Sequence, residues 1–400
     1  MSFNLEPSFQ TLKSYCESEN FAGWDPYDGL NSKVFQATPL KHWDLARLAW
    51  IQGFKRSPLN FRKLLLVPKQ HNAKGIALFL LGYCRLYEVA SNGNTEFGTP
   101  EELLEKIKYL TQRLLDMKVE GYAGACWGYN FDWQARRLFL FEKNTPTVVA
   151  TAFCVEALIE SYKITQDQNV LNTALSSAAF VLQDLSRTAH GQGHIFSYSV
   201  KDGNNTVINA SLLGAKILSY AYKYKQKEAY LDMANKAVVA ACDLQEADGS
   251  WIYGLLPVQS WKDSFHTGFN LEAIATYQQN TGDTTVQNYI DKGWAYYTAH
   301  FFEADGKPKY YHDKTYPVDI HCPAQVIVTA SKLNQFKTHV ALLERTLNWT
   351  IKNMQSKKGY FYYQLKRGVS SKIPYMRWSN AFMFNAMAHY FYERQTSKTP

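Results

Sequence analysis

The sequence has no long run of apolar residues. None of its windows approaches about 18 uncharged apolar residues, which is roughly what a membrane-spanning helix requires. A transmembrane helix is therefore excluded. The N-terminus reads Met-Ser-Phe-Asn-Leu-Glu-Pro, with no basic segment followed by an apolar run, so we expect no Sec signal peptide.

Cysteine is scarce, and the spacing of the cysteines does not indicate disulfide pairs. The six cysteines are scattered, without a Cys-x-x-Cys pair. We therefore expect reduced thiols in a cytoplasmic protein rather than a disulfide framework. The sequence also lacks a glycine-rich dinucleotide fingerprint and a P-loop, so we expect no organic cofactor.

The charge balance is only mildly basic, since 43 Lys and Arg against 35 Asp and Glu leave a net charge of +8. The basic runs are short, so a nucleic-acid partner is not favoured. An acidic glycan would suit this sign of charge, and so would plain solubility. Aromatic residues are the abundant class, because 10 Trp, 27 Tyr and 23 Phe make up 15% of the chain. Many of them stand in glycine-containing loops, where a hydrophobic core does not need them.

A short motif recurs along the chain: a glycine, then an aromatic residue, then usually a tyrosine. Successive copies lie 69, 55, 59 and 51 residues apart, counted between their first aromatic residues, which are Trp127, Phe196, Trp251, Tyr310 and Phe361. Five copies at such similar spacing indicate a repeated structural unit.

Apolar and amphipathic segments alternate around these motifs. Six apolar segments begin near Lys74, Pro146, Thr206, His266, His321 and Arg377. Amphipathic segments lie between them, and residues 42–54 supply the first. Because a helix that is apolar on all sides must be buried, this alternation predicts six inner and six outer helices.

The pattern is typical of an all-α protein with an (α/α)6 toroid, in which six helical hairpins form inner and outer rings. We expect a lead-in over 1–39, one toroid domain over 40–395 and a tail over 396–400. The alternative is an open α-solenoid, whose repeats are shorter, at about 34–47 residues.

Two repeats contain a Gln-x-x-x-Gly-x-aromatic loop, at residues 245–251 and 355–361. This loop resembles the QW motif of terpene cyclases. The whole plan resembles the six-hairpin toroid superfamily, which includes terpene cyclases, prenyltransferase β-subunits and (α/α)6 glycosidases, lyases and glucuronyl epimerases.

Further segments resemble proteins of the VpsJ type, which are encoded in bacterial exopolysaccharide and capsule clusters. These segments are residues 127–133, 145–147, 316–321 and 377–380. The resemblance covers nearly the whole chain and implies a saccharide substrate without naming a reaction.

The chain departs from several toroid enzymes in informative ways. The Asp-x-Asp-Asp acid of squalene-type cyclases is absent, so terpene cyclisation lacks its proton donor. No strong Cys/His pattern matches the zinc site of the toroidal prenyltransferases. The acid signatures of unsaturated glucuronyl hydrolases are also absent.

Candidate site residues cluster at the expected starts of the inner helices, where free N–H groups and positive helix dipoles converge. In the loop 127–136, Asp132 between two aromatic residues is a candidate general acid. Trp127, Tyr129, Trp133 and Arg136 are candidate sugar-binding residues. Alternatively, Asp132 pairs with Arg136 or caps a turn.

Two Asp/His pairs open the fourth and fifth inner helices. Asp263 can orient His266 as a base, although Asp263 is also a good N-cap. Asp319 and His321 form the second pair, and ring closure should make the two histidines neighbours. A zinc site at His266, His321 and Cys322 stays open as the weaker alternative. Nearby aromatic residues are candidates for substrate binding: Trp251, Tyr253, Trp261 and Tyr311.

The last inner helix begins with Arg377, Trp378 and Asn380. The guanidinium of Arg377 could hold a uronate carboxylate through two hydrogen bonds, with Trp378 as a stacking platform and Asn380 beside it. The alternative is an arginine that ties the ring shut.

These observations predict a carbohydrate-active protein of polysaccharide biosynthesis or processing. We expect it to act on an acidic glycan by hydrolysis, β-elimination or C5-epimerisation. Its partners would be a carbohydrate polymer or oligosaccharide and other polysaccharide-assembly proteins. The alternatives are a non-catalytic glycan-binding or assembly protein, and a terpene-cyclase-like or zinc-dependent toroid. The sequence does not distinguish these reactions or name the sugar.

Overall fold

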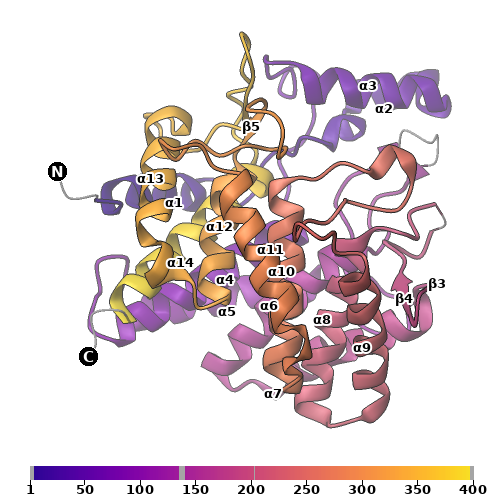
Figure 1. The fold of residues 1–400 in the computed structure, drawn as a ribbon. Coiled ribbons are helices and arrows are strands. Elements are labelled where there is room, and N and C mark those ends of the chain that lie inside the picture. The colour runs from indigo at the N-terminus through magenta and orange to yellow at the C-terminus, as the bar shows by residue number, and fades with distance from the viewer. Residues whose placement is uncertain (1–3, 135–139, 202, 397–400) are drawn as a thin grey trace.

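The computed structural model describes residues 4–134, 140–201 and 203–396. Six apolar helices form its inner ring (Figure 1), namely α4 (Ala73–Ser91), α6 (Val148–Thr165), α8 (Ile208–Lys225), α10 (Ser264–Thr281), α12 (His321–Lys332) and α14 (Phe382–Thr396). Each packs against the next, and α14 packs against α4, which closes the ring. The predicted (α/α)6 toroid is confirmed, and the open solenoid is excluded.

Amphipathic helices surround the inner ring, and α5 shows why they form where they do. Thr99 and Glu102 make a reciprocal capping box at its start, which satisfies two free N–H groups. Its apolar residues Leu103, Ile107, Leu110 and Leu114 follow a helical period and are buried. The outer helices that follow inner helices in sequence are α5 (Pro100–Asp116), α7 (Gln168–Ala179), α9 (Glu228–Asp243), α11 (Gln287–His300) and α13 (Phe336–Met354).

The sixth outer position belongs to α1 (Glu6–Ser18), which packs against α14. The sequence assigns an outer helix to residues 42–54 instead, and this is wrong. The helix found there, α3 (Asp44–Arg56), packs on η1 (Asp28–Asn31), η2 (Pro39–His42) and β1 (Trp133–Gln134), away from the ring. Helix α1 thus joins the ring from within the expected lead-in, and the limits 40 and 395 stay a prediction.

The connections at the N-terminal ends of the inner helices carry the remaining elements. Three antiparallel strand pairs occur there among the described residues: β1 with β2 (Leu140–Phe141), β3 (Arg187–His190) with β4 (Gly193–Phe196), and β5 (Val318–Asp319) with β6 (Gln364–Leu365). Short helical turns accompany them: α2 (Lys33–Gln36), η3 (Phe180–Asp184), η4 (Pro257–Gln259) and η6 (Met376–Ala381). One further turn, η5 (Thr284–Val286), connects α10 to α11 at the opposite end of the inner helices. In Figure 1, α2 and α3 lie at the top, above the ring. None of the described helices is long and apolar enough to cross a membrane.

In two of the repeated glycine–aromatic motifs, the tryptophan fixes the loop to the preceding outer helix. The indole N–H of Trp127 donates to the carbonyl of Leu114 at 2.8 Å, and that of Trp251 donates to Ala241 at 2.8 Å. Both indoles are buried, at 0% and 2% exposure. Their predicted role in sugar binding is therefore wrong, because neither ring is accessible to a ligand.

The glycine of the motif packs on the other side, against the next outer helix, and Gly249 and Gly93 form a matched pair that tests this packing. Both have left-handed backbones, with φ of 91° and 94°, but only at Gly249 would a Cβ overlap backbone, namely the carbonyl of Lys292. We expect Gly93→Ala to lose only about 1–2 kcal/mol through strain. Gly249→Ala should lose about 1–3 kcal/mol more through overpacking. Urea denaturation measures both, and equal losses would contradict a packing role for the motif.

Candidate active site

Asp263 and His266 form a fixed pair at the start of α10. One carboxylate oxygen of Asp263 accepts the backbone N–H of His266 at 3.0 Å, as an N-cap does. The other oxygen lies 2.7 Å from Nδ1 of the same histidine and accepts the indole N–H of Trp261 at 2.9 Å. The Asp263 side chain is fully buried, whereas that of His266 is 21% exposed. A buried carboxylate thus orients an accessible imidazole.

This arrangement leaves the second ring nitrogen of His266 free to act. Among the described residues, none makes a hydrogen bond to Nε2. When Nδ1–H donates to a carboxylate, Nε2 carries the basic lone pair, so this nitrogen can accept a proton from a substrate. Tyr253 stacks on Trp261 at 4.7 Å between ring centroids and lies 4.6 Å from the His266 ring. The imidazole therefore lies beside an aromatic wall of the kind that sugars stack on.

The second predicted pair, Asp319 and His321, lies next to the first. The ring of Phe265 is 4.3 Å from His266 and 5.0 Å from His321, so ring closure makes the two histidines near neighbours, as the sequence predicts. Asp319, however, is fully buried, and its two oxygens accept from the backbone of His321, the indole of Trp378 and the amide of Gln364. With its oxygens occupied in this way, Asp319 holds β5, α12 and the last inner segment together, and its predicted role as an acid or base is corrected.

His321 itself is enclosed by aromatic rings. Its centroid lies 3.7 Å from that of Phe382 and 4.3 Å from that of Trp378, and its exposure is 1%. Burial lowers its pKa to about 3, so the imidazole is neutral. It shapes the wall of the site rather than exchanging protons with solvent. Among the described residues, no three His, Cys, Asp or Glu side chains are grouped to hold a metal, so the zinc site left open at His266, His321 and Cys322 is not formed.

Asp132 has a local role in the β1–β2 hairpin. Its carboxylate accepts the backbone N–H of Lys143 at 2.6 Å, which closes the turn. The structure thus shows the turn-capping alternative and not a desolvated general acid. Trp133 stacks on Phe141 at 5.0 Å and is partly exposed, while Arg136 lies outside the described residues.

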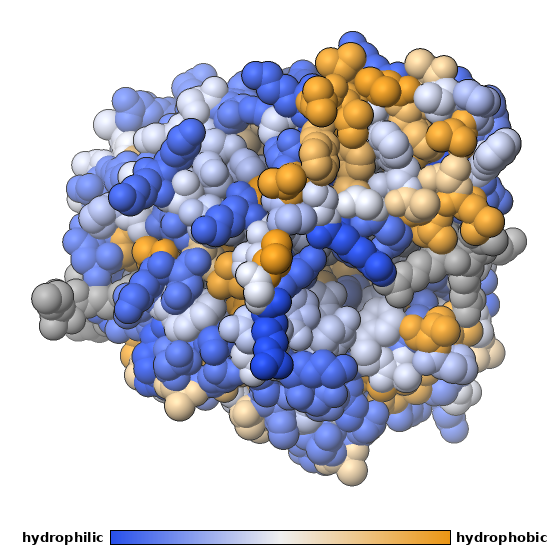
Figure 2. Space-filling view, turned by 90° about the horizontal axis from the view of Figure 1, so that it is seen from above, coloured by the Kyte–Doolittle hydropathy of each residue, from blue (hydrophilic) through white to orange (hydrophobic). Residues whose placement is uncertain are grey.

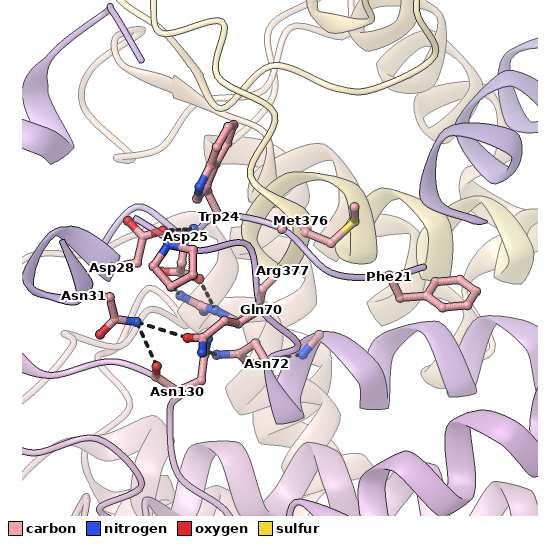
Figure 3. Close-up of a pocket in the computed structure, with 13 residues that line it drawn as sticks. Phe21, Trp24, Asp25, Asp28, Asn31, Gln70, Asn72, Asn130, Met376 and Arg377 are labelled. Carbon is pink, nitrogen blue, oxygen red and sulfur yellow. Dashed lines mark hydrogen bonds and ion pairs between the residues drawn. The ribbon is translucent and has the colours of Figure 1, made fainter. Parts of the chain in front are cut away.

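Arg377 is already paired. Its guanidinium donates to Asp25 at 2.6 and 2.8 Å, and both side chains are buried (Figure 3). The predicted uronate clamp is therefore wrong, because Asp25 occupies the position that a substrate carboxylate would take. Asn380 is also structural, since its side chain bonds the backbone of Phe361 and Tyr375.

A small polar cavity adjoins this ion pair (Figure 3), lined by Asn31, Gln70, Asn72 and Asn130 among others. Its volume is about 10 Å³, which is room for about one water molecule. It is too small for a sugar. Asp25 was missed by sequence reasoning, although it stands between Trp24 and Pro-Tyr in the same aromatic setting that drew attention to Asp132.

Lys74, in the first turn of α4, is a second residue that sequence reasoning missed. Its ammonium lies 4.1, 4.9 and 5.0 Å from the ring centroids of Phe153, Phe269 and Phe382, and the residue is only 4% exposed. No carboxylate among the described residues is within ion-pair distance. Burial, and then the charge of Arg377, lower the pKa of Lys74 well below its usual value. The sequence signal was a lysine opening an otherwise apolar inner segment.

Tyrosines from several connections gather at the mouth of the ring around Tyr27, which belongs to the N-terminal segment. Tyr27 lies 5.7 Å from Trp378 and 6.1 Å from Trp133, and its hydroxyl bonds Lys55 at 2.7 Å. Burial raises the pKa of four further phenols, and the charge of Tyr27 is a smaller cause for each: Tyr129, Tyr253, Tyr310 and Tyr363. These phenols are therefore neutral proton donors near one another, and the N-terminal segment partly covers them.

The predicted substrate-binding residues thus divide into two groups. Tyr253, Trp261, Trp378, Trp133 and Tyr129 are partly exposed around the mouth, and Tyr311 follows Tyr310 there. Trp127, Trp251, Arg377 and Asn380 are buried structural residues. The role of the first group in binding stays a prediction.

Lys74 and Lys216 provide two contrasting variants. Lys74→Met replaces an unpaired buried amine by an apolar chain of similar length, so we expect the free energy of unfolding at pH 7 to be unchanged or higher. Lys216→Met removes a partner 2.7 Å from the buried Glu156, which keeps Lys332 at 2.6 Å. We expect that variant to lose about 1.5–3 kcal/mol. Urea denaturation measures the free energy of unfolding of both variants. A large loss of stability in Lys74→Met would contradict our conclusion that the Lys74 amine has no ion-pair partner.

The pH dependence of the same comparison tests the lowered pKa of Lys74. Above the folded pKa, the unfolded chain binds the proton that the folded chain lacks. Wild-type stability relative to Lys74→Met should therefore rise as the pH increases towards the unfolded pKa of about 10.4. We expect urea denaturation at about pH 7 and about pH 9.5 to show this shift. If the difference in stability between the wild type and Lys74→Met were the same at both pH values, the pKa of Lys74 would not be lowered.

Comparisons with known proteins agree with this architecture. No protein-family model matches the chain, and no curated protein matches it. A GH76 α-mannanase from Bacteroides thetaiotaomicron has a similar structure, with a TM-score of 0.63 and 14% identity over 82% of this chain and 88% of that chain. A cellobiose 2-epimerase from Bacillus thermoamylovorans gives 0.58 and 14% over 80% and 88%. An unsaturated glucuronyl hydrolase specific for heparin gives 0.56 and 14% over 81% and 86%. At these identities, the likeness establishes the fold, an (α/α)6 toroid.

Proposed function

We propose that this chain is a carbohydrate-active enzyme that removes the proton next to the carboxylate of a uronate-containing glycan, leading to β-elimination or C5-epimerisation. The observation that carries the proposal is the accessible imidazole of His266, held by the buried Asp263 beside an aromatic wall. The similar structures include an epimerase and a glucuronyl hydrolase, and these names support a sugar substrate.

In this mechanism, Nε2 of His266 takes the C5 proton of the uronate. The C–H electron pair moves into the carboxylate as an enolate, and then either expels the 4-oxygen substituent or accepts a proton on the opposite face. Tyr253 would supply the proton, since its ring centroid lies 4.6 Å from that of the imidazole and burial keeps its phenol neutral. Free N–H groups at the inner-helix starts and the amine of Lys74 would stabilise the carboxylate and its enolate.

Hydrolysis by two carboxylates is less well supported. That reaction requires an acid and a second carboxylate facing the same glycosidic bond. Of the three carboxylates that the sequence proposes, Asp132 closes a turn and Asp319 accepts from three donors of the protein. Asp263 is fully buried behind His266. Both oxygens of Asp263 and of Asp319 are engaged by donors within the protein, and one oxygen of Asp132 is used to close its turn. This favours chemistry centred on the histidine.

The biological setting belongs to the proposal as well. The resemblance of four segments to exopolysaccharide and capsule cluster proteins supports a role in polysaccharide synthesis. We therefore propose a cytoplasmic enzyme of that process, working with other polysaccharide-assembly proteins. The mildly basic charge suits an acidic polymer.

The test is solvent proton exchange on a panel of uronate polymers, including alginate, polygalacturonate, heparin and hyaluronan. In D2O, the wild type should incorporate deuterium at C5 or produce the unsaturated uronate, measured by mass spectrometry and ultraviolet absorbance. His266→Ala should lose about 10²–10⁴-fold in rate, the usual contribution of a general base. Exchange that persists in this variant would contradict the proposal, as would hydrolysis without exchange on every polymer.

Asp263→Asn and Asp132→Asn serve as matched variants. Asparagine is as good an N-cap as aspartate, so Asp263→Asn should keep the fold of α10 while removing the charge behind the imidazole. We expect its rate to fall at least about 100-fold with thermal stability nearly unchanged. Asp132→Asn keeps an acceptor for the turn and should retain activity. A similar loss of rate in both variants would contradict the role of Asp263 in orienting His266.

A further inference from the structure

The segment that lies above the ring exposes an unusual number of apolar side chains. Among the described residues, twelve large hydrophobic side chains are exposed, and eight of them fall between residues 34 and 66. The most exposed are Leu64 at 74%, Leu45 at 69%, and Trp43 and Leu59 at 63% each. The remaining four are Val34, Leu40, Phe61 and Leu66. Seen from above, Figure 2 shows hydrophobic side chains gathered over one part of this face. These side chains do not contribute to the hydrophobic core, and an exposed apolar patch of this kind is typical of an interaction site.

The same segment contains almost all of the net charge. Residues 33–69 include five Lys and three Arg against one acid, Asp44, which gives 8 − 1 = +7 of the total +8. The rest of the chain, with 35 basic and 34 acidic residues, is nearly neutral. Residues 33–69 are therefore strongly basic, although the whole chain is only mildly so. We call the exposed basic and apolar side chains of this segment the cap surface.

Several of these cations have no partner in the protein. Arg47 pairs with Asp44, Arg62 with Asp28 and Lys69 with Glu19. Lys33, Arg56 and Lys63 are exposed, and no acid among the described residues lies within ion-pair distance of them. Three positive charges are therefore left for an external anion.

A second element adds to the cap surface. The β5–β6 unit continues into a loop whose tip exposes Val369 at 62% beside Arg367. Figure 1 shows the loop of the β5–β6 unit reaching the top of the molecule, where α3 also lies. Burial, followed by the charges of Arg56 and Lys55 in α3, lowers the pKa of Lys366 in this loop, which agrees with that arrangement. Apolar and basic groups from two distant parts of the chain thus share one side of the molecule.

The alternation of basic and apolar side chains on the cap surface indicates which kind of partner it binds. Lys41 and His42 precede Trp43, and Lys63 precedes Leu64. A second copy of the chain would bring like charges together, and the cores of protein interfaces are depleted of lysine. A bilayer with anionic lipids accepts both groups, because apolar side chains and Trp enter the headgroup boundary while Lys and Arg bind the lipid phosphates.

We propose that the cap surface binds the surface of a membrane containing anionic lipids, without crossing it. The proposal is independent of the reaction at His266. In Figure 1, α3 lies above the mouth of the ring, so a bound membrane would lie on the side where the inner helices begin.

Vesicle co-sedimentation tests the electrostatic part. The wild type should bind vesicles of phosphatidylcholine with about 30% phosphatidylglycerol, bind pure phosphatidylcholine far more weakly, and weaken as salt increases. Lys33→Gln/Arg56→Gln/Lys63→Gln should lose about 100-fold in affinity, at about fivefold per cation. The matched control, Lys223→Gln/Lys225→Gln/Lys227→Gln, removes three exposed lysines at the opposite end of the inner helices and should bind nearly as well as the wild type.

Site-specific labelling tests the apolar part. All six native cysteines are buried, so Leu64→Cys introduces a single accessible site for an environment-sensitive dye. Its emission should shift to the blue on anionic vesicles, while the same dye at Lys225→Cys should not respond. Trp43→Ser/Leu45→Ser/Leu64→Ser should reduce the binding that remains at high salt.

Four results would overturn the proposal. They are no binding of the wild type to anionic vesicles, equal binding to neutral vesicles, equal losses in the two triple-cation variants, and a dimer in sedimentation analysis that the Trp43/Leu45/Leu64 variant dissociates. Thermal unfolding of every variant should match the wild type, because all the exchanged side chains are exposed.

Discussion

Closure of the inner helical ring is the constraint on which the rest of the structure depends. Because α14 packs against α4, the first and last inner helices are neighbours, and all six inner helices begin at the same mouth. This brings Asp25 to Arg377 across 352 residues of sequence, where they form a buried ion pair. The same closure places the connections around one mouth, where tyrosines, His266 and the N-terminal segment meet.

Buried ion pairs connect distant segments of this ring. The pair of Arg377 and Asp25 is satisfied, as is Glu156 between Lys216 and Lys332. Removing one partner from such a pair is costly, and these groups therefore fix the arrangement of the helices. Lys74 differs from them, because three aromatic rings lie against its amine and no carboxylate of the described residues is within ion-pair distance. An unpaired buried amine contributes little to stability, and its retention fits the role in substrate binding proposed for it.

The sequence predicts the fold well because the information is local and repeated. Apolar segments, capping residues such as Thr99 and the spacing of glycine–aromatic loops each follow from helix physics. The outer helix at 42–54 was misassigned because amphipathicity does not tell a ring helix from one that packs on a loop. Helix α1 precedes the first repeat, so no periodicity marks it as the sixth outer helix.

The site was predictable only where its partners are close in sequence. Asp263 and His266 are three residues apart at a helix start, and their pairing follows from capping geometry alone. The partners of Arg377 and Asp319 come from distant segments, Asp25 for the first and Gln364 and Trp378 for the second. Contacts of this kind decide whether a polar side chain already has hydrogen-bond partners within the protein, and a single sequence does not reveal them.

The most direct measurement is a crystal structure of Asp263→Asn with a uronate oligosaccharide. The account predicts a sugar ring at the mouth, with C5 facing Nε2 of His266 and the ring against Tyr253 and Trp261. A ligand bound elsewhere on the toroid, or one whose C5 faces away from His266, would contradict it.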